Sequence, residues 1–340
     1  MKRKKTEYKT NRWESILVVS VLFMMLGLLL VLPANAQKQK LLTMGTTSGS
    51  SGYFATNVTW AKIVNKYLPE VNITPIETGA TVDNAKRIGR GEIELGFGSA
   101  IPEYQSYEGI GEFKDRQVKK IRQAWIWDYA TFNYIVRADS GVNSLKDLEG
   151  KKFSVGIPGS STELSTLAFL EEAGVRVNIE RSSTSDAIAS IQDRRIVGMV
   201  KGSTNPDSAI LSLMATTPIK ILSLRDEDLN KLFKKFPYLI KMTVTDDTYP
   251  KLSGFNTYAM TTGISMSSDL PQELQYKIVK TVYEHLDEFF TSQPRYKVFG
   301  DPLELTRSKA VIPLAAGTVQ FLKEKGFTVP ARLIPPEYKE

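Results

Sequence analysis

Residues Thr46 to Phe54 read TTSGSSGYF and separate a short apolar run, Leu41 to Met44, from a segment with helical spacing, Tyr53 to Tyr67. After Thr46 the stretch holds two glycines and four small hydroxyl side chains, at Thr47, Ser48, Ser50 and Ser51. A turn of this kind between a strand and a helix exposes backbone N–H groups at the positive end of the helix dipole, where a carboxylate or phosphate is stabilised. A flexible loop with a helix cap has the same composition, so the other turns of the chain must decide between the two.

The segments around this turn alternate between strands and helices. Apolar or β-branched runs at Leu41–Met44, Val71–Ile76 and Ile93–Phe97 predict strands, and segments with helical spacing lie between them. This order predicts a parallel sheet with helices on both faces. Ligands bind such sheets beyond the carboxyl ends of the strands, which is where the turns after these three strands are expected.

The pattern changes at about residues 121–138 and then starts again. Ile121–Trp127 and Phe132–Val136 predict two consecutive strands with no helix between them. A second set of alternating strands and helices begins at Lys152. The last part of the chain predicts three further elements, namely a strand at Tyr258–Met266, a long amphipathic helix at Leu270–Phe290 and a final helix at Val311–Lys325.

These blocks predict an α/β protein with two lobes joined by hinge strands around a cleft. We expect residues 37–138 and 249–340 to form lobe 1 and residues 139–248 to form lobe 2, with the chain crossing between them near Asn133–Asp139 and near Tyr249–Tyr258. A chain of 340 residues with 42% apolar and 24% charged residues has the size and composition for two such units.

Residues 1–36 read as a secretory signal peptide. Six basic residues precede the apolar run Ile16–Val31, and Ala34-Asn35-Ala36 is a small-x-small cleavage site, so we expect an exported chain that begins at Gln37. An uncleaved membrane anchor is the alternative, because the apolar run approaches the length that spans a bilayer. Cleavage would lower the formal net charge from +7 to +3, a small and scattered excess that gives no reason to expect nucleic acid as a partner.

The chain has no cysteine and a single histidine, His285. Disulfides, thiol nucleophiles, thiolate metal sites and a lipid-anchored cysteine are therefore excluded. We expect His285 on a helix surface, and no nucleophile-elbow motif accompanies it for a Ser-His-Asp triad. We accordingly expect no metal, no cofactor and no enzymatic activity. An exported enzyme with hydroxyl or carboxylate chemistry is the alternative that turnover of a bound ligand would reveal.

Four turns share the chemistry of the first one. They are TTSGSSGYF at 46–54, ETGATVDN at 77–84, GIPGSST at 156–162 and KGSTNPD at 201–207, each between a predicted strand and a predicted helix. Helix capping needs one hydroxyl or amide side chain in a turn, and these turns hold three or more. The excess predicts a polar cleft that binds a ligand, shared between the two lobes.

The candidate ligand-binding residues come from these turns and from the end of the strand before Ser99. They are Ser48, Ser51, Tyr53, Thr81, Asn84, Ser99, Ser160, Ser161, Thr162 and Asn205. No arginine lies in the four turns, so an anion would be held by helix N-termini and hydroxyl groups rather than by a guanidinium. Lys201 is the one cation adjacent to a turn.

The order and spacing of several motifs between Leu41 and Gly326 resemble the TAXI family of solute receptors, the extracytoplasmic subunits of TRAP-type transporters. The motifs are the opening turn with Tyr53-Phe54, Thr78-Gly79 with Asn84, Gly98-Ser99, Ser144-Leu145-Lys146-Asp147-Leu148 before Gly150-Lys151-Lys152, Val155-Gly156 with Pro158-Gly159-Ser160-Ser161-Thr162, and Thr248-Tyr249-Pro250. Three positions depart from the family pattern: Ala80 where a second glycine is common, the longer polar turn KGSTNPD, and Pro313-Leu314-Ala315-Ala316-Gly317-Thr318 near the end.

This resemblance implies a two-lobed periplasmic binding protein of type II that captures an acidic amino acid such as glutamate, or a related dicarboxylate, by hinge closure. It also implies delivery of the solute to a TRAP-type membrane permease, with no chemistry done on the ligand. A ligand-binding sensor domain that feeds a membrane signalling protein is the alternative that keeps the same fold.

Overall fold

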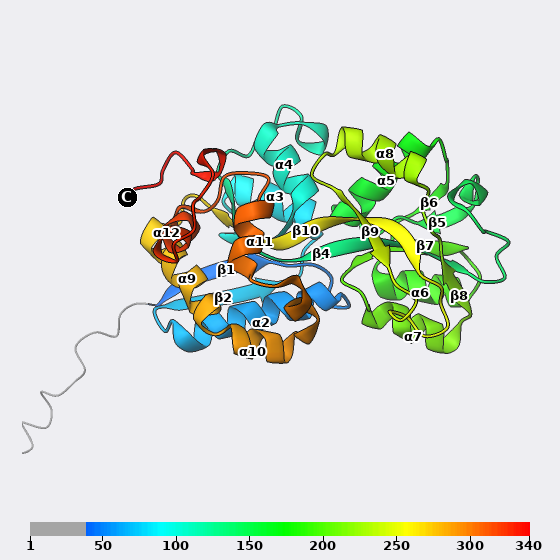
Figure 1. Cartoon of the computed structure of the whole chain (residues 1–340), viewed down its shortest axis with the longest axis horizontal. Coiled ribbons are helices and arrows are strands. Elements are labelled where there is room, and N and C mark those ends of the chain that lie inside the picture. Colours follow the sequence, from blue (N-terminus) through cyan, green and yellow to red (C-terminus); the bar gives the residue numbers. More distant parts are fainter. Residues whose placement is uncertain (1–38) are drawn as a thin grey trace, which may run out of the picture. The chain divides into compact units, whose positions relative to one another are not determined.

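A ten-stranded sheet runs through the chain in the order β2-β1-β3-β10-β4-β7-β5-β6, with β8 beside β4 and β9 beside β10 (Figure 1). The computed structural model describes residues 39–340, so the predicted signal peptide and its cleavage site lie outside the described residues. The strands are β1 (Lys40–Gly45), β2 (Val71–Ile76), β3 (Leu95–Ser99), β4 (Ile121–Arg137), β5 (Lys152–Ser154), β6 (Asn178–Glu180), β7 (Gly198–Ser203), β8 (Ile219–Ile221), β9 (Ile240–Val244) and β10 (Phe255–Ser267).

Helices cover both faces of this sheet within the unit Leu41–Glu340 (Figure 1). They are α2 (Gly52–Tyr67), α3 (Thr81–Arg90), α4 (Ala100–Glu108), α5 (Ser161–Ala173), α6 (Thr184–Gln192), α7 (Ser208–Thr216), α8 (Asp226–Lys235), α9 (Gln272–Glu284), α10 (Leu286–Ser292), α11 (Pro302–Lys309) and α12 (Ala316–Glu324). Short 3-10 turns lie at η1 (Gly111–Phe113), η2 (Leu145–Leu148), η3 (Pro294–Phe299) and η4 (Ala331–Leu333). Within residues 39–340, no helix is both long and apolar enough to cross a bilayer.

The sheet is parallel at its two ends and antiparallel in its middle. β1 pairs with β3 in parallel, and β5 pairs in parallel with both β6 and β7. Between these ends, β10 runs antiparallel to β3 and β4, and β4 runs antiparallel to β7. The alternation of strands and helices predicted the parallel parts, whereas the antiparallel pair β4 and β10 joins the two lobes (Figure 1).

The long strand β4 differs from the expected pair of short strands. Asp128, Tyr129, Ala130 and Thr131, read as the break between them, continue as extended backbone that pairs with β10. The same strand then pairs with β7 from Thr131 to Val136. Because β4 pairs with β10 along its first part and with β7 along its second part, its polar residues do not interrupt it.

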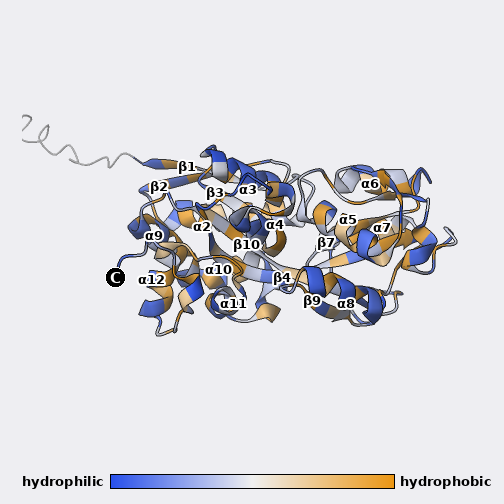
Figure 2. Cartoon of the chain, turned by 90° about the horizontal axis from the view of Figure 1, so that it is seen from above, coloured by the Kyte–Doolittle hydropathy of each residue, from blue (hydrophilic) through white to orange (hydrophobic). Residues whose placement is uncertain are grey.

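Each lobe has an apolar core on both faces of the sheet. In the lobe that contains β1, β2 and β3, one core holds Trp60, Trp125 and Trp127 under α2 and α9, and a smaller one forms under α3. In the other lobe, consecutive residues of β4 alternate between two cores, with Tyr134 in one and Ile135 in the other. This alternation follows from the period of two in a strand. Figure 2 shows the matching arrangement, with hydrophilic residues on the outward sides of helices such as α8.

Two predicted helices have different limits in the structure. The expected helix Leu270–Phe290 is split into α9 and α10 at His285, whose backbone leaves the helical region and whose ring stacks on Tyr67 at 3.5 Å between centroids. The expected helix Val311–Lys325 begins at Ala316 instead. Pro313 precludes a helix there, and Leu314 forms a β-bridge with Gln123 of β4.

Candidate functional site

A cavity of about 70 Å³ lies where the turns of both lobes meet. More than half of its lining residues carry hydroxyl groups, namely Thr47, Ser48, Ser51, Tyr53, Thr81, Ser154, Ser160, Ser161, Thr162, Ser182, Ser183, Thr184 and Thr262. The apolar part of the wall consists of Ala80, Phe97, Ala130, Ile157, Ala187, Met199, Val200 and Met260. A buried water needs roughly 10–15 Å³, so the cavity admits about five waters or one small organic molecule.

Four helices begin at this cavity, two from each lobe. Three start with a serine cap: Ser51 accepts from the N–H of Tyr53 in α2, Ser160 from Glu163 in α5, and Ser183 from Asp186 in α6. The fourth helix, α3, begins with Thr81 and has no side-chain cap. Each of these helices follows a strand that ends next to the cavity. The positive ends of four helix dipoles therefore lie around it.

The two lobes are in direct contact across the cavity rim. The carbonyl of Gly159 accepts from the backbone N–H of Val82 at 2.9 Å and of Asp83 at 3.4 Å, and so caps α3 from the opposite turn. The N–H of Ser161 donates to the Thr81 hydroxyl at 3.1 Å. A methyl group on Gly79 would lie 3.2 Å from the carbonyl oxygen of Pro158, so glycine permits this close approach. The structure therefore represents a closed cleft.

Ala80 holds a backbone conformation that only glycine adopts readily. Its φ of 72° and ψ of −151° lie in a sparsely populated region, and such a residue costs of order 1–3 kcal/mol. Ala80 is buried and lines the cavity. Strain of this kind is concentrated at binding sites, where the surrounding structure holds it in place.

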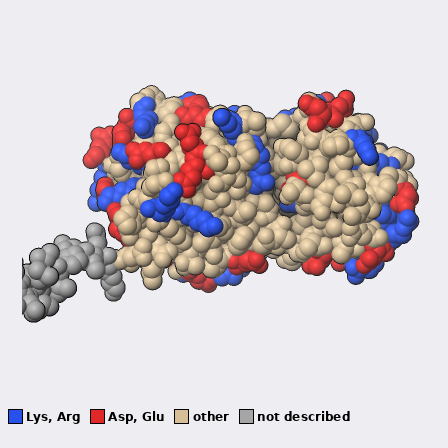
Figure 3. Space-filling view, turned by 90° about the horizontal axis from the view of Figure 1, so that it is seen from below, with Lys and Arg blue, Asp and Glu red and all other residues tan. Residues whose placement is uncertain are grey.

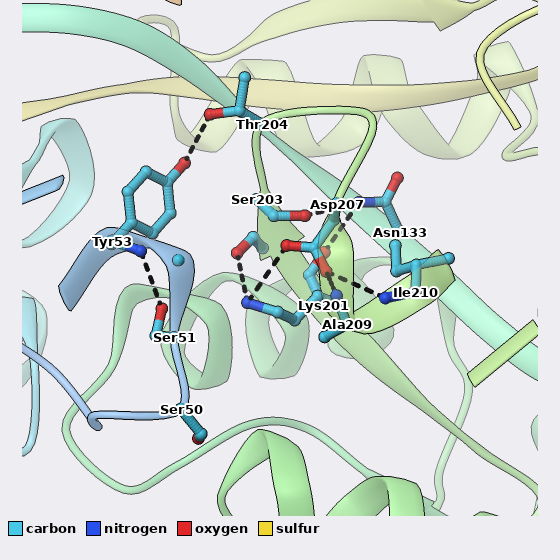
Figure 4. Close-up of polar contacts among 12 residues, drawn as sticks. Ser50, Ser51, Tyr53, Asn133, Lys201, Ser203, Thr204, Asp207, Ala209 and Ile210 are labelled. Carbon is cyan, nitrogen blue, oxygen red and sulfur yellow. Dashed lines mark hydrogen bonds and ion pairs between the residues drawn. The ribbon is translucent and has the colours of Figure 1, made fainter. Parts of the chain in front are cut away.

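Lys201 brings a positive charge to the cavity wall. Its side chain is 9% exposed, and its Nζ lies 3.8 Å from Oδ2 of Asp207 and 3.5 Å from the carbonyl of Gly202 (Figure 4). Among the described residues that line the cavity, no other carries a charged side chain. On the outer face that Figure 3 shows, by contrast, Lys and Arg lie among Asp and Glu on both lobes.

Beneath the cavity, a buried carboxylate joins elements of both lobes. Asp128 of β4 accepts hydrogen bonds from the hydroxyl groups of Tyr53, Thr204 and Thr262. Burial raises the pKa of Asp128 to about 6, and the three hydroxyl donors limit that rise. The group fixes the ring of Tyr53 at the cavity wall through a 3.2 Å hydrogen bond, and Figure 4 shows the Tyr53 hydroxyl directed at Thr204.

Seven of the ten residues predicted from the sequence line the cavity: Ser48, Ser51, Tyr53, Thr81, Ser160, Ser161 and Thr162. The other three lie outside its wall. Asn84 donates to the carbonyls of Gly45, Thr46 and Phe97 and so joins the ends of two strands. Ser99 is fully buried at the start of α4. Asn205 exchanges hydrogen bonds with Asn133 and accepts one from Tyr249.

Several lining residues were not among the predicted ones. Ser182, Ser183 and Thr184 form a fifth turn, after β6, with the same strand–hydroxyl–helix pattern as the other four. Its sequence therefore carries the same signal as the four turns identified above. Thr262 comes from the middle of β10, where no turn indicates it. Lys201, the one cation adjacent to a predicted turn, forms part of the cavity wall.

The arrangement can bind a small anion. Among residues 39–340, no group of three or more His, Asp or Glu side chains is placed to hold a metal ion. The one histidine, His285, stacks on Tyr67 and does not line the cavity. Hydroxyl groups, helix N-termini and a lysine ammonium bind a carboxylate well.

The model of the NMT1-like family matches residues 44–326. The chain belongs to the NMT1-like family. Its match spans both lobes and all of the residues that line the cavity. Several of the solved structures that are similar to this NMT1-like chain are described as solute-binding or substrate-binding proteins.

Three of these structures illustrate the similarity. The periplasmic aliphatic sulphonate binding protein SsuA from Escherichia coli is 15% identical, with a TM-score of 0.42 over 86% of this chain and 94% of that one. GshT of Streptococcus mutans, from a study of glutathione import, is 15% identical, with a TM-score of 0.49 over 76% and 95%. A TctC solute binding protein from Polaromonas is 14% identical, with a TM-score of 0.44 over 77% and 90%. At this distance none of them indicates a ligand for this chain.

Proposed function

We propose that this NMT1-like protein is the extracytoplasmic solute receptor of a TRAP-type secondary transporter of the TAXI kind. It captures a small carboxylate, an acidic amino acid such as glutamate or a related dicarboxylate, and delivers it to the membrane permease. The chain is exported by its N-terminal signal and cleaved between Ala36 and Gln37. It then works outside the cytoplasmic membrane, without a cofactor.

One observation supports this proposal above the others: the cavity is enclosed by turns of both lobes, and four helix N-termini converge on it. A ligand in this cavity touches both lobes only when the cleft is closed. Its binding energy therefore favours the closed state over the open one.

The proposed mechanism has three steps. The solute first docks on lobe 1, residues 37–138 and 249–340, against Ser48, Ser51 and Thr81. Lobe 2, residues 139–248, then rotates about β4 and β10 and brings Ser160, Ser161 and Lys201 onto the ligand. The permease binds the closed form and takes up the solute with a coupling ion.

Isothermal titration calorimetry on the mature chain, residues 37–340, tests the proposal. The ligand panel contains small mono- and dicarboxylates and their amino-acid analogues. We expect at least one to bind with a Kd below about 1 mM, an affinity of roughly 4 kcal/mol or more. If every member of the panel binds more weakly than this, the protein is not a carboxylate receptor.

A further inference from the structure

The cavity wall is positively charged and holds no carboxylate. Lys201 is the one charged side chain among the described lining residues. The starts of α2, α3, α5 and α6 add partial positive charge at the same place. The wall therefore attracts an anion and repels a cation.

The ammonium of Lys201 can donate a hydrogen bond to a further partner. Its two recorded contacts, to the carbonyl of Gly202 at 3.5 Å and to Asp207 at 3.8 Å, are long for an ammonium with three donors. Asp207 uses its other oxygen to cap α7, where it accepts from the N–H groups of Ala209 at 2.9 Å and Ile210 at 3.1 Å. A buried, weakly paired cation on a cavity wall is suited to an anionic ligand.

Three carboxylates near the cavity are paired with other groups of the protein. Asp83 accepts from Arg87 at 2.8 Å, and Glu163 accepts from Arg181 at 2.5 Å. Asp128 lies beneath the wall, where three hydroxyl groups donate to it. None of these three residues lines the cavity. An ammonium group on the ligand would consequently be buried without an opposite charge.

We infer that the cavity selects compact organic anions that lack an ammonium group, so that dicarboxylates are ligands and the matching α-amino acids are not. This inference rests on the proposed function and chooses between the two ligand classes that it allows. The apolar wall, which includes Phe97, Met199 and Met260, suits the methylene groups of such a dicarboxylate. The volume of about 70 Å³ suits a small molecule.

Calorimetry with matched pairs on the mature wild-type protein tests the inference without any variant. The pairs are glutarate with glutamate and succinate with aspartate, which differ in the ammonium group alone. Since a buried charge without a partner is strongly unfavourable, we expect the dicarboxylate of each pair to bind at least about 100-fold more tightly.

A lysine variant tests the source of the selectivity. Lys201→Gln should weaken glutarate binding at least about tenfold, because a charge-assisted hydrogen bond is lost. Lys62→Gln, at an exposed position of α2, is the matched control and should leave the affinity unchanged. Thermal unfolding of both variants checks that they are folded.

The outcomes separate the two proposals. Glutamate binding as tightly as glutarate, or more tightly, overturns the inference and leaves the carboxylate receptor standing. An unchanged glutarate affinity in folded Lys201→Gln also overturns it. If no carboxylate and no amino acid binds, the proposed function fails, and this inference fails with it.

Discussion

Replacing Thr81 with alanine tests whether contacts between the turns hold the cleft closed. In the structure the Thr81 hydroxyl accepts the N–H of Ser161, which begins α5 in the opposite turn, at 3.1 Å. Both residues are buried, with 2% and 7% of their surface exposed. In Thr81→Ala this N–H has no acceptor when the cleft is closed, but water can satisfy it when the cleft is open.

The size of the effect follows from that difference. Leaving a buried N–H without an acceptor costs about 1–3 kcal/mol. Since the loss falls on the closed state alone, it shifts the equilibrium between open and closed forms by about 5- to 150-fold. Ligand affinity falls by the same factor when the open form predominates in the free protein.

Two measurements on each variant separate closure from direct ligand contact. Small-angle X-ray scattering of the ligand-free protein reports the population of the compact form, and calorimetry reports the affinity. Thr81→Ser keeps the hydroxyl acceptor and should resemble the wild type in both. If Thr81→Ala shows an unchanged closed population and an unchanged affinity, the hydrogen bond between the turns does not control closure.

Three further predictions concern the cavity wall and the group beneath it. Burial raises the pKa of Asp128 to about 6. It also raises the pKa of Glu103, a buried residue of α4 whose carboxylate accepts from Gln123 and Ser265, to about 7. Each folded-state value lies above the unfolded one, so stability is greatest below about pH 4 for these groups and is lost as the pH rises. The loss from Asp128 is about 3 kcal/mol between pH 4 and pH 6. Urea unfolding across pH 4–8 should therefore show a loss of stability that is smaller by this amount in Asp128→Asn, which retains Glu103, than in the wild type. The double variant Ser51→Ala with Tyr53→Phe should bind glutarate at least about tenfold more weakly while it unfolds in one cooperative transition, and an unchanged affinity would mean that this turn is only a helix cap. Ala80→Gly should gain about 1 kcal/mol in the free energy of unfolding, because relief of an unfavourable backbone conformation exceeds the entropy that glycine adds to the unfolded chain; a loss of stability would show that Ala80 is not strained.

Most of the cavity could be predicted because strand order and turn composition are properties of the sequence. When strands end at one edge of a sheet, the turns after them meet there, as the turns at Ser51 and Ser160 do. The turn at Ser182–Thr184 has the same composition but was not among the four predicted turns.

The amino-acid composition of a turn does not determine the direction in which each of its side chains points. Thr81 and Asn84 lie one helical turn apart in α3, yet Thr81 lines the cavity and Asn84 points into the sheet. The side-chain amide of Asn84 donates to backbone carbonyls at the ends of β1 and β3, and these hydrogen bonds hold it against the sheet. Asn205 is directed in the same way to Asn133 of β4.

The prediction of two short strands in place of β4 was wrong because the hydrogen-bond partners of its polar residue Asp128 are distant in the sequence. Asp128 interrupts an apolar run in the sequence, and a local reading places a turn there. In the structure its carboxylate accepts from hydroxyl groups of α2, β10 and the turn after β7, and these contacts offset the cost of its burial. The partners Tyr53 and Thr204 lie 75 and 76 residues away in the chain.

The most direct test of capture by closure is a titration that records binding and compaction together. Glutarate is added to the mature chain while calorimetry measures heat and X-ray scattering measures the radius of gyration. We predict one saturable site with a Kd below about 1 mM and a decrease in the radius of gyration that follows the same binding curve. Saturable binding with no compaction would contradict hinge closure, and the absence of saturable binding by glutarate and every other carboxylate would contradict the receptor itself.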